Sequence, residues 1–435
     1  MTAVVLFTRD LRVHDQPALA AACRDHDEVV PLFVADDRIL AARTASPNRA
    51  AFLAESLAEL RSALRDRGGD LAIRRGDVVA ETMRLARQVD ARTVLASADV
   101  SAYAQRRQER LAAEVGGSGL EVRLMPGVTV VPPGSLTPQS GDHYRVFTPY
   151  HRVWESATWR SEEPAPPAVR LPTGVAVGRL PGPDDLVPGN RSPRLPAGGE
   201  PAGRRLLESV ARRLSDGEPD FQSMAGDHTS RLSPYLHLGC VSPLAAASRL
   251  DHSPNLVRQL AWRDFLHQVT AAFPTIATDD YRSRVSGWRH DDGALDAWRA
   301  GRTGVPIVDA GMRQLLAEGW MHNRARLITA SFLTKTLQLD WRPGAEHFFR
   351  WLVDGDIANN AGNWQWVAGT GNSTRPNRVL NPIRQAHRFD PAGDYVRRYV
   401  PELAAVPGKA VQEPWKLPSA ERSRLDYPPP IIEGR

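Results

Sequence analysis

Residues 354–366 read Asp-Gly-Asp-Ile-Ala-Asn-Asn-Ala-Gly-Asn-Trp-Gln-Trp and combine two carboxylates, several amides and two indoles. Buried carboxylates and amides cost free energy unless each finds a partner, so packing alone rarely needs such a segment. Side chains of these kinds could hydrogen-bond the edge of a large, flat heteroaromatic ring. The segment is therefore the first candidate for a ligand site.

Residues 229–233, Thr-Ser-Arg-Leu-Ser, place three hydroxyls directly before a proline and a helical stretch. Hydroxyls and free backbone N–H groups at such a junction can bind a pyrophosphate. A plain helix N-cap followed by a turn would explain the same residues. The residues alone leave both interpretations open.

A third group lies inside a helical pattern, where Gln259, Trp262 and Arg263 share one face at the spacing i, i+3, i+4. These side chains could hold a stacked base or the edge of a flavin. A core tryptophan flanked by surface polar groups would give the same spacing. Further along, Arg326 and Asp354 are candidates for a buried ion pair that would hold a loop over residues 354–366 in place.

The first part of the chain supplies elements that must position these residues, because short apolar runs alternate there with helical periodicity. This alternation predicts a doubly wound, parallel five-stranded α/β sheet over residues 1–130. Thr-Arg-Asp-Leu-Arg follows the first strand in place of Gly-x-Gly-x-x-Gly, so a nucleotide fingerprint is missing. We expect strands at residues 3–8, 29–34, 71–74, 93–97 and 122–125, and helices at residues 17–24, 49–67, 78–89 and 102–115.

The rest of the chain divides into a connector and a helical domain. Residues 131–203 hold 14 of the chain's 35 prolines and predict a connector over the surface, with one helix near residues 150–159. Helical periodicity dominates residues 204–435 and predicts an all-helical second domain. Its strongest helical stretches are residues 204–214, 242–250, 254–272, 292–300, 305–318, 322–338 and 343–354.

The composition is that of a globular protein, with 435 residues, 42% hydrophobic and 24% charged. No apolar run approaches the length of a membrane span. Cys23 and Cys240 stand far apart and in no metal-binding spacing, so we expect a cytoplasmic protein without a metal site. The net charge of +5 permits a polyanionic partner such as DNA without demanding one.

Residues 229–236, 320–326 and 354–366 together resemble the photolyase/cryptochrome family of flavoproteins, and most closely its microbial class I cyclobutane pyrimidine dimer photolyases. The resemblance extends from Arg9-Asp-Leu-Arg-Val-His-Asp-Gln-Pro to Glu413-Pro-Trp-Lys and Tyr427-Pro-Pro-Pro, and leaves out only the proline-rich connector. It implies that the helical domain binds FAD, folded into a U shape at the bottom of a cavity.

The resemblance also implies roles for individual residues. Three tryptophans match the family's electron-transfer chain to the flavin, although each taken alone would more often be a core residue; they are Trp288, Trp341 and Trp364. The FAD phosphates would be held by Thr229, Ser230, Leu232 and Ser233. The isoalloxazine would be surrounded by Arg263, Asn323, Asp354, Asp356 and Asn360, with Arg326 beside Asp354 and Asn360 facing flavin N5.

The implied activity is light-driven DNA repair by a carbon–carbon lyase. A cyclobutane pyrimidine dimer would be flipped into the cavity and split by an electron from photoexcited, reduced FAD. UV-damaged DNA is thus the expected partner of a monomeric protein, with no protein partner implied. The implied lesion-binding residues are Gln259, Trp262, Asn323, Leu327 and Trp366.

Several residues depart from the family pattern. Gln259 stands in place of a common glutamate, Leu327 in place of a methionine, and residues 215–228 lack a usual tyrosine. Ala361 resembles (6-4) photolyases, but their His-His pair is replaced by His322-Asn323. A cryptochrome-like blue-light photoreceptor and a (6-4) photolyase therefore stay open as alternatives, and we predict the cyclobutane dimer as the substrate.

An antenna chromophore would lie in the α/β domain. Tyr103 and Ala104 stand where folate-binding relatives have an Asn-Glu pair, so folate is not expected. Arg49 and Asp99 match positions in relatives that bind 8-hydroxy-5-deazaflavin. The alternatives are an empty antenna site or a second flavin.

Overall fold

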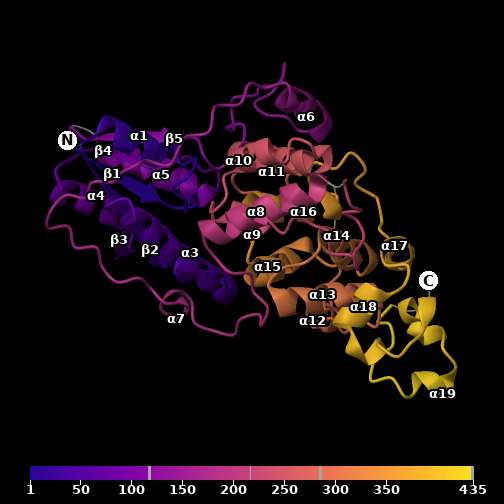
Figure 1. The fold of residues 1–435 in the computed structure, drawn as a ribbon. Coiled ribbons are helices and arrows are strands. Elements are labelled where there is room, and N and C mark those ends of the chain that lie inside the picture. The colour runs from indigo at the N-terminus through magenta and orange to yellow at the C-terminus, as the bar shows by residue number, and fades with distance from the viewer. Residues whose placement is uncertain (116–118, 216, 284–286, 433–435) are drawn as a thin grey trace.

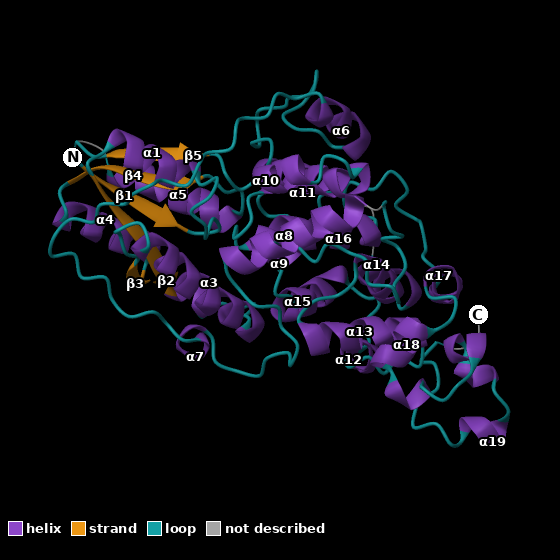
Figure 2. Cartoon of the chain, in the orientation of Figure 1, coloured by secondary structure: helices purple, strands orange, loops and turns teal. Residues whose placement is uncertain are grey.

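The structure is a computed structural model that describes residues 1–115, 119–215, 217–283 and 287–432. An α/β part at the amino terminus lies beside a larger helical part (Figure 1). Within the described residues, strands occur in the first part alone (Figure 2). None of the described helices is both long and apolar enough to span a lipid bilayer.

The five parallel strands confirm the predicted doubly wound sheet, and their order is β3-β2-β1-β4-β5. The chain first builds outward from β1 to β3 and then returns to add β4 and β5, so the switch point lies between β1 and β4. The strands are β1 (Thr2–Phe7), β2 (Glu28–Asp36), β3 (Ala72–Gly76), β4 (Ala91–Ser97) and β5 (Glu121–Met125). The helices are α1 (Pro17–Asp25), α2 (Asp37–Leu40), α3 (Pro47–Arg65), α4 (Val78–Gln88) and α5 (Ala102–Glu114).

Both faces of the sheet are covered, as the near-continuous apolar run of β1 predicts. Ala3, Val5 and Phe7 pack into one apolar cluster with α1 and α3. Val4 and Leu6 point the other way and pack with α4. Helices therefore cover both faces of β1.

The connector packs more closely than a loose surface segment would. Its backbone accepts hydrogen bonds from the sheet, with Val29 N–H donating to Arg170 O and Ile73 N–H to Val177 O, both at 2.8 Å. It contains α6 (Phe147–Glu155), which begins before the predicted residue 150, and the short α7 (Pro183–Leu186). The Trp154 side chain on α6 is fully buried and donates to Asp264 Oδ2 at 3.0 Å, so the connector is anchored in the helical part.

The helical part is confirmed as all-helical over its described residues. Its longer helices are α8 (Glu200–Ser215), α10 (Pro243–Arg249), α11 (Pro254–Ala272), α12 (Asp292–Arg299), α13 (Pro306–Glu318), α14 (Asn323–Ser331), α15 (Trp341–Trp351), α16 (Ile357–Ala368), α17 (Pro382–Phe389) and α18 (Asp394–Tyr399). Shorter pieces are α9 (Ser233–His237), α19 (Ser419–Arg422), the π-helical turn η1 (Phe332–Thr336) and the 3-10 turns η2 (Pro401–Leu403), η3 (Gly408–Gln412) and η4 (Pro414–Lys416).

One prediction for this part is wrong, and another differs in detail. The loop expected over residues 354–366 is mostly α16, whose asparagines and glycine are weak helix formers and hide its periodicity. The Asp356 side chain caps this helix, and the helix is held from two sides, by Ala358 and Ala361 in one apolar cluster and by Trp364 in another. The helical stretch predicted over residues 322–338 is helical from Asn323 to Thr336, but it changes from α14 to the π-helical turn η1 at Phe332.

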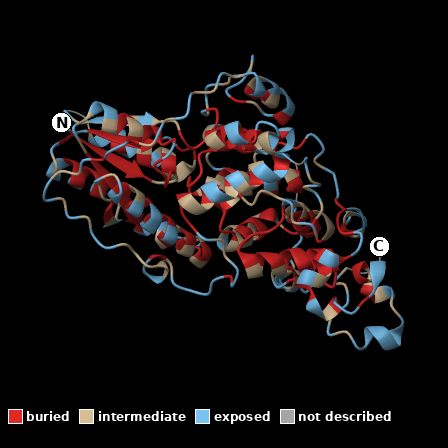
Figure 3. Cartoon of the chain, viewed as in Figure 1, coloured by how far each residue is buried: buried red, intermediate tan, exposed pale blue. Residues whose placement is uncertain are grey.

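The two parts share one apolar core. A continuous cluster of buried side chains runs from β1 through α3 and α8 to α11 and α16. Helix α11 is buried from Leu260 to Thr270, apart from Trp262 (Figure 3). A second cluster around Trp298 and Trp364 fills the helical part on the other side of α16. The helices that carry the candidate site are therefore held by packing on two sides.

Candidate functional site

A cavity of about 600 Å³ opens into the helical part, within the range typical of ligand pockets. Most of the predicted cofactor- and lesion-binding residues line it: Thr229, Ser230, Leu232, Ser233, Gln259, Trp262, Arg263, Asn323, Arg326, Leu327, Asp354, Asp356 and Trp366. The three charged residues among these that are at most 8% exposed we call the floor: Arg263, Asp354 and Asp356. The five predicted lesion-binding residues are all half-buried or exposed, and we call them the mouth: Gln259, Trp262, Asn323, Leu327 and Trp366.

Asp354 on the floor is half of the predicted ion pair. Arg326 Nη2 donates to Asp354 Oδ2 at 2.8 Å, which confirms the pairing. The second carboxylate oxygen, Oδ1, is buried and has no hydrogen-bond partner within the described residues. An open acceptor on the floor of a cavity suits a ring N–H of a bound heterocycle.

Asp356 on the floor is held on both of its oxygens. Oδ1 accepts from Asn359 N–H at 2.8 Å and so caps α16, while Oδ2 accepts a short hydrogen bond from Arg9. Burial by itself would raise the pKa of Asp356. Nearby positive charge, Arg9 first, outweighs the burial and holds the pKa well below its usual value. The floor therefore carries an ionised, oriented carboxylate at neutral pH.

The hydroxyls of residues 229–233 do not cap the helix that follows. The N-cap of α9 is Leu232, with no side-chain hydrogen bond, so the plain N-cap interpretation is wrong. Arg231 braces the segment through Asp227 at 2.5 Å and Glu318 at 3.0 Å. The Thr229, Ser230 and Ser233 hydroxyls of this braced turn lie at the cavity, where the phosphates of a ligand could bind them.

The predicted face of α11 lies on the cavity wall. Trp262 stacks on Phe147 of the connector, with ring centroids 3.7 Å apart and planes 7° from parallel. One face of the indole is thus covered, while Trp262 as a whole lines the cavity. This arrangement favours a stacking surface over a core tryptophan.

His322, which no sequence pattern assigned to the cavity, also lines it and is almost fully buried. Its Nδ1 accepts from Arg324 N–H at 3.1 Å, so the proton lies on Nε2, which has no partner within the described residues. Burial lowers the pKa of His322 to about 4, so the imidazole is neutral at physiological pH. It offers a neutral donor in the lining of the cavity that also holds the open acceptor of Asp354.

The three predicted electron-transfer tryptophans lie in one apolar cluster. Trp341 and Trp364 are buried and Trp288 is half-buried. The Trp364 ring lies where a side chain on Gly344 would stand, one turn after Trp341 on α15. A fourth tryptophan, Trp298, packs edge to face on Trp364 with ring centroids 6.0 Å apart. Indoles that share one apolar cluster are the arrangement that stepwise electron transfer through Trp288, Trp341 and Trp364 would need.

Two family models match the chain. "DNA photolyase" matches residues 3–170 and "FAD binding domain of DNA photolyase" matches residues 256–435. A deoxyribodipyrimidine photo-lyase of Streptomyces griseus is 53% identical, over 99% of this chain and 96% of that protein. The chain belongs to the photolyase/cryptochrome family. Its sheet and helical part are the family's α/β and FAD-binding domains.

Solved structures of the photolyase/cryptochrome family have the same fold. A class III photolyase from Agrobacterium tumefaciens is 32% identical, with a TM-score of 0.88 over 99% of this chain and 94% of that one. A cryptochrome from Synechocystis is 30% identical, with a TM-score of 0.91 over 99% of this chain and 96% of that one. Photolyases and cryptochromes thus share this architecture, and the fold alone does not separate repair from signalling.

The cavity fits the FAD of this photolyase family. The open acceptor of Asp354 and the open donor of His322 are buried polar atoms that a flavin edge would satisfy. The turn at residues 229–233 offers hydroxyls for the phosphates. The departing segment 215–228 also takes part, since residues 219–222 line the cavity, while Asp216 lies outside the described residues.

Three of the predicted cofactor and antenna residues lie away from the cavity lining. Asn360 donates to Ala345 O at 2.9 Å, while its neighbours Asn359 and Asn363 line the cavity in its place. Arg49 donates to the Phe349 and Leu352 carbonyls at the end of α15, and Asp99 pairs with Arg9. Of the two proposed antenna residues, Arg49 is therefore committed to a contact between the domains and Asp99 to an ion pair within the α/β domain.

Proposed function

We propose that the protein is a light-driven DNA repair enzyme that splits cyclobutane pyrimidine dimers. The observation that carries this proposal is that predicted FAD residues and predicted lesion residues line one cavity, with charges on its floor and aromatic rings at its mouth. The 53% identical relative is itself named deoxyribodipyrimidine photo-lyase.

The mouth would receive a flipped lesion. Trp262, backed by Phe147, and Trp366 offer ring faces for the two bases. The exposed amide of Gln259 both donates and accepts, and can therefore pair with pyrimidine edges without a carboxylate. Leu327 adds an apolar wall of about the size of the methionine it replaces.

The floor would hold the cofactor. When bound in its reduced form, FAD supplies the electron that light transfers to the dimer. Asp354 and His322 would orient the ring edge, and the turn at residues 229–233 would hold the phosphates. These side chains would position the cofactor and the lesion and would exclude water. Because the dimer is split by electron transfer, no general base or nucleophile is required.

The tryptophan cluster would resupply electrons. Trp364, Trp341 and Trp288 run from the buried interior to a half-buried position. We propose that this order carries electrons inward to the flavin, and that Asn360 acts through α15 and α16 instead of lining the cavity.

DNA would be gripped through its phosphates beside the mouth. Arg324 lines the cavity, and positive charge on Arg378 and Arg388 lies near enough to add to burial in lowering the pKa of Arg324. Arginines that lie so close together repel one another, and DNA phosphates that neutralise their charge would relieve this repulsion. We propose that these arginines contact the DNA backbone without reading its sequence.

We also propose that the protein is cytoplasmic and monomeric. Its domains would be residues 1–130 and 204–435, joined by the connector 131–203.

From the family pattern at Arg49 and Asp99, we propose 8-hydroxy-5-deazaflavin as the antenna chromophore. The hydrogen bonds of Arg49 and Asp99 would have to be exchanged for bonds to the chromophore. With their present hydrogen bonds, Arg49 and Asp99 are not available to bind that chromophore.

The test is blue-light splitting of a thymine dimer in an oligonucleotide by the anaerobically reduced protein, with a dark control and a parallel (6-4) photoproduct. We expect repair of the cyclobutane dimer in the light alone. Repair of the (6-4) photoproduct alone would change the substrate. An FAD-loaded, photoreducible protein that repairs neither lesion would make it a photoreceptor.

A further inference from the structure

The segment that replaces the nucleotide fingerprint after β1 reaches into the helical domain. Leu11 N–H donates to Leu238 O at 3.1 Å, and Arg12 Nη1 donates to Gly239 O at 2.9 Å. Gly239 has a φ of +66°, and a side chain there would collide with the Arg9 backbone. Two separate sequence motifs are therefore complementary surfaces of one domain interface.

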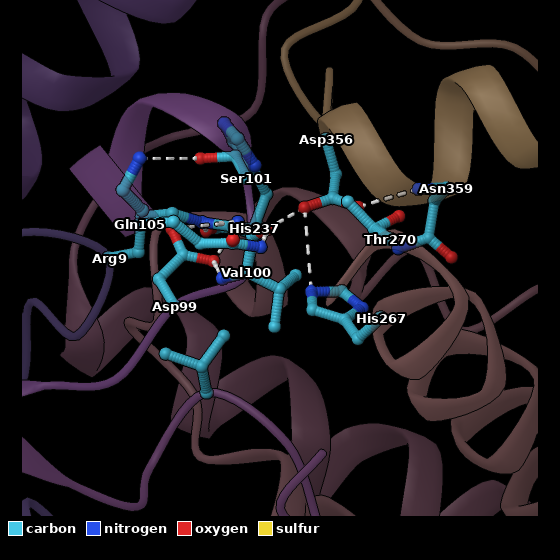
Figure 4. Close-up of polar contacts among 12 residues, drawn as sticks. Arg9, Asp99, Val100, Ser101, Gln105, His237, His267, Thr270, Asp356 and Asn359 are labelled. Atoms are coloured by element: carbon cyan, nitrogen blue, oxygen red, sulfur yellow. Dashed lines mark hydrogen bonds and ion pairs between the residues drawn. The ribbon is translucent and has the colours of Figure 1, made fainter. Parts of the chain in front are cut away.

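Arg9 is the residue of this segment that reaches the floor of the cavity. Its Nε donates to His237 O at 3.1 Å and its Nη1 to Asp99 Oδ1 at 3.2 Å. Its Nη2 donates to Asp356 Oδ2, so one guanidinium joins a carboxylate after β4 to a carboxylate at the start of α16 (Figure 4). The side chains of Arg9, Asp99 and Asp356 are 16%, 4% and 5% exposed.

The other cationic groups around Asp356 are poorly placed to replace Arg9. His267 Nε2 lies 3.7 Å from Asp356 Oδ2, and burial lowers the pKa of His267 to about 4, which leaves it neutral. Burial likewise lowers the pKa of His237 well below its usual value. Arg263 Nη1 donates to Val128 O at 2.5 Å. Arg9 therefore supplies the direct charged hydrogen bond to Asp356.

We propose that Arg9, although it belongs to the α/β domain, is a positioning residue of the FAD site, which it serves by fixing the orientation and charge of Asp356. FAD affinity then depends on the docking of the α/β domain, even though Arg9 does not line the cavity. This inference rests on the FAD-binding part of the proposed function and is independent of which lesion is repaired.

The test is a double-mutant cycle on FAD affinity, measured by titrating FAD into the apoprotein and following flavin fluorescence. Arg9→Gln should weaken FAD binding about tenfold or more, because the buried Asp356 loses its charged partner. Arg9→Lys, which keeps the charge, should recover most of that loss. In the Asp356→Asn background, Arg9→Gln should change the affinity by less than about twofold, because Arg9 acts through Asp356.

Arg43→Gln is the matched control. Arg43 also joins the two domains, by donating to Glu346 at 2.7 Å, but this pair is exposed and away from the cavity lining. The control should leave the FAD affinity unchanged. If Arg9→Gln does not fold, as judged by circular dichroism, the cycle is run with Arg9→Lys, whose smaller loss should also vanish in the Asp356→Asn background.

Equal losses from the Arg9 substitution with and without Asp356 would overturn the inference, as would an unchanged affinity beside a lower melting temperature. Either result would show that Arg9 joins the two domains without acting on the FAD site. Because the readout is FAD affinity, a protein that fails to repair dimers can still confirm or refute the role of Arg9.

Discussion

The floor and the mouth of the cavity are built by opposite means. On the floor, Asp354 and Asp356 are buried, ionic and held by Arg326 and Arg9. At the mouth the side chains are neutral and half-buried or exposed, and only Trp262 is backed by a stacked ring. Fixed buried charges suit a ligand that stays bound, whereas neutral stacking surfaces suit one that enters and leaves. The difference teaches that one cavity can hold a resident cofactor and an exchanging substrate.

The largest effect should come from the floor. Asp354→Ala removes the partner of Arg326 and the open acceptor, and breaking a buried charge pair costs about 2–5 kcal/mol. We expect almost complete loss of FAD, measured as the flavin-to-protein absorbance ratio after gel filtration. Asp354→Asn, which keeps the shape, should retain more FAD. Full FAD occupancy in the alanine variant would contradict the role given to the floor.

The next effect should come from the mouth and leave FAD in place. Trp262→Ala should weaken binding of dimer-containing DNA by about 1–3 kcal/mol through the lost stacking surface. Electrophoretic mobility shifts with damaged and undamaged duplexes measure the change, and Trp351→Ala, outside the cavity lining, is the control. A uniform loss on both duplexes would remove Trp262 from lesion recognition.

The tryptophan cluster should affect neither binding step. Trp364→Phe should slow photoreduction of the flavin while leaving repair by chemically pre-reduced enzyme almost intact. Trp298→Phe tests the neighbouring ring, which lies 6.0 Å from Trp364, and should leave photoreduction close to normal. If Trp364→Phe reduced both processes equally, Trp364 would have a structural role only.

The smallest effect concerns pH. Burial lowers the pKa of His267, His322 and His347 to about 4, below the ordinary value of 6.5. As the pH falls below 6.5, these histidines bind protons in the unfolded chain before they do so in the folded protein. The free energy of unfolding is therefore highest above pH 6.5 and decreases as the pH falls toward 4. At pH 5 each histidine should lower the free energy of unfolding by up to about 2 kcal/mol relative to neutral pH. His347→Phe should flatten the fall in melting temperature, and an unchanged slope would argue against a buried neutral His347.

The sheet was predictable because burial on both faces leaves a continuous apolar run in β1. Helix α16 was not, because Asn359, Asn360 and Asn363 are poor helix formers, and its N-cap and buried face emerge only in the fold. The contribution of Arg9 was out of reach, since Asp356 lies 347 positions away along the chain. The Arg326–Asp354 pair was within reach, because Asp354 begins a polar segment and a buried carboxylate there needs a partner of opposite charge.

The most direct test of the two-ended cavity is flavin fluorescence of the anaerobically reduced protein with and without dimer-containing DNA. If floor and mouth belong to one cavity, a bound dimer lies against the flavin and should quench its emission by taking the electron. Undamaged DNA of the same sequence should leave the emission unchanged. Emission that stays unchanged while the dimer-containing DNA is bound would place the lesion elsewhere and contradict the account.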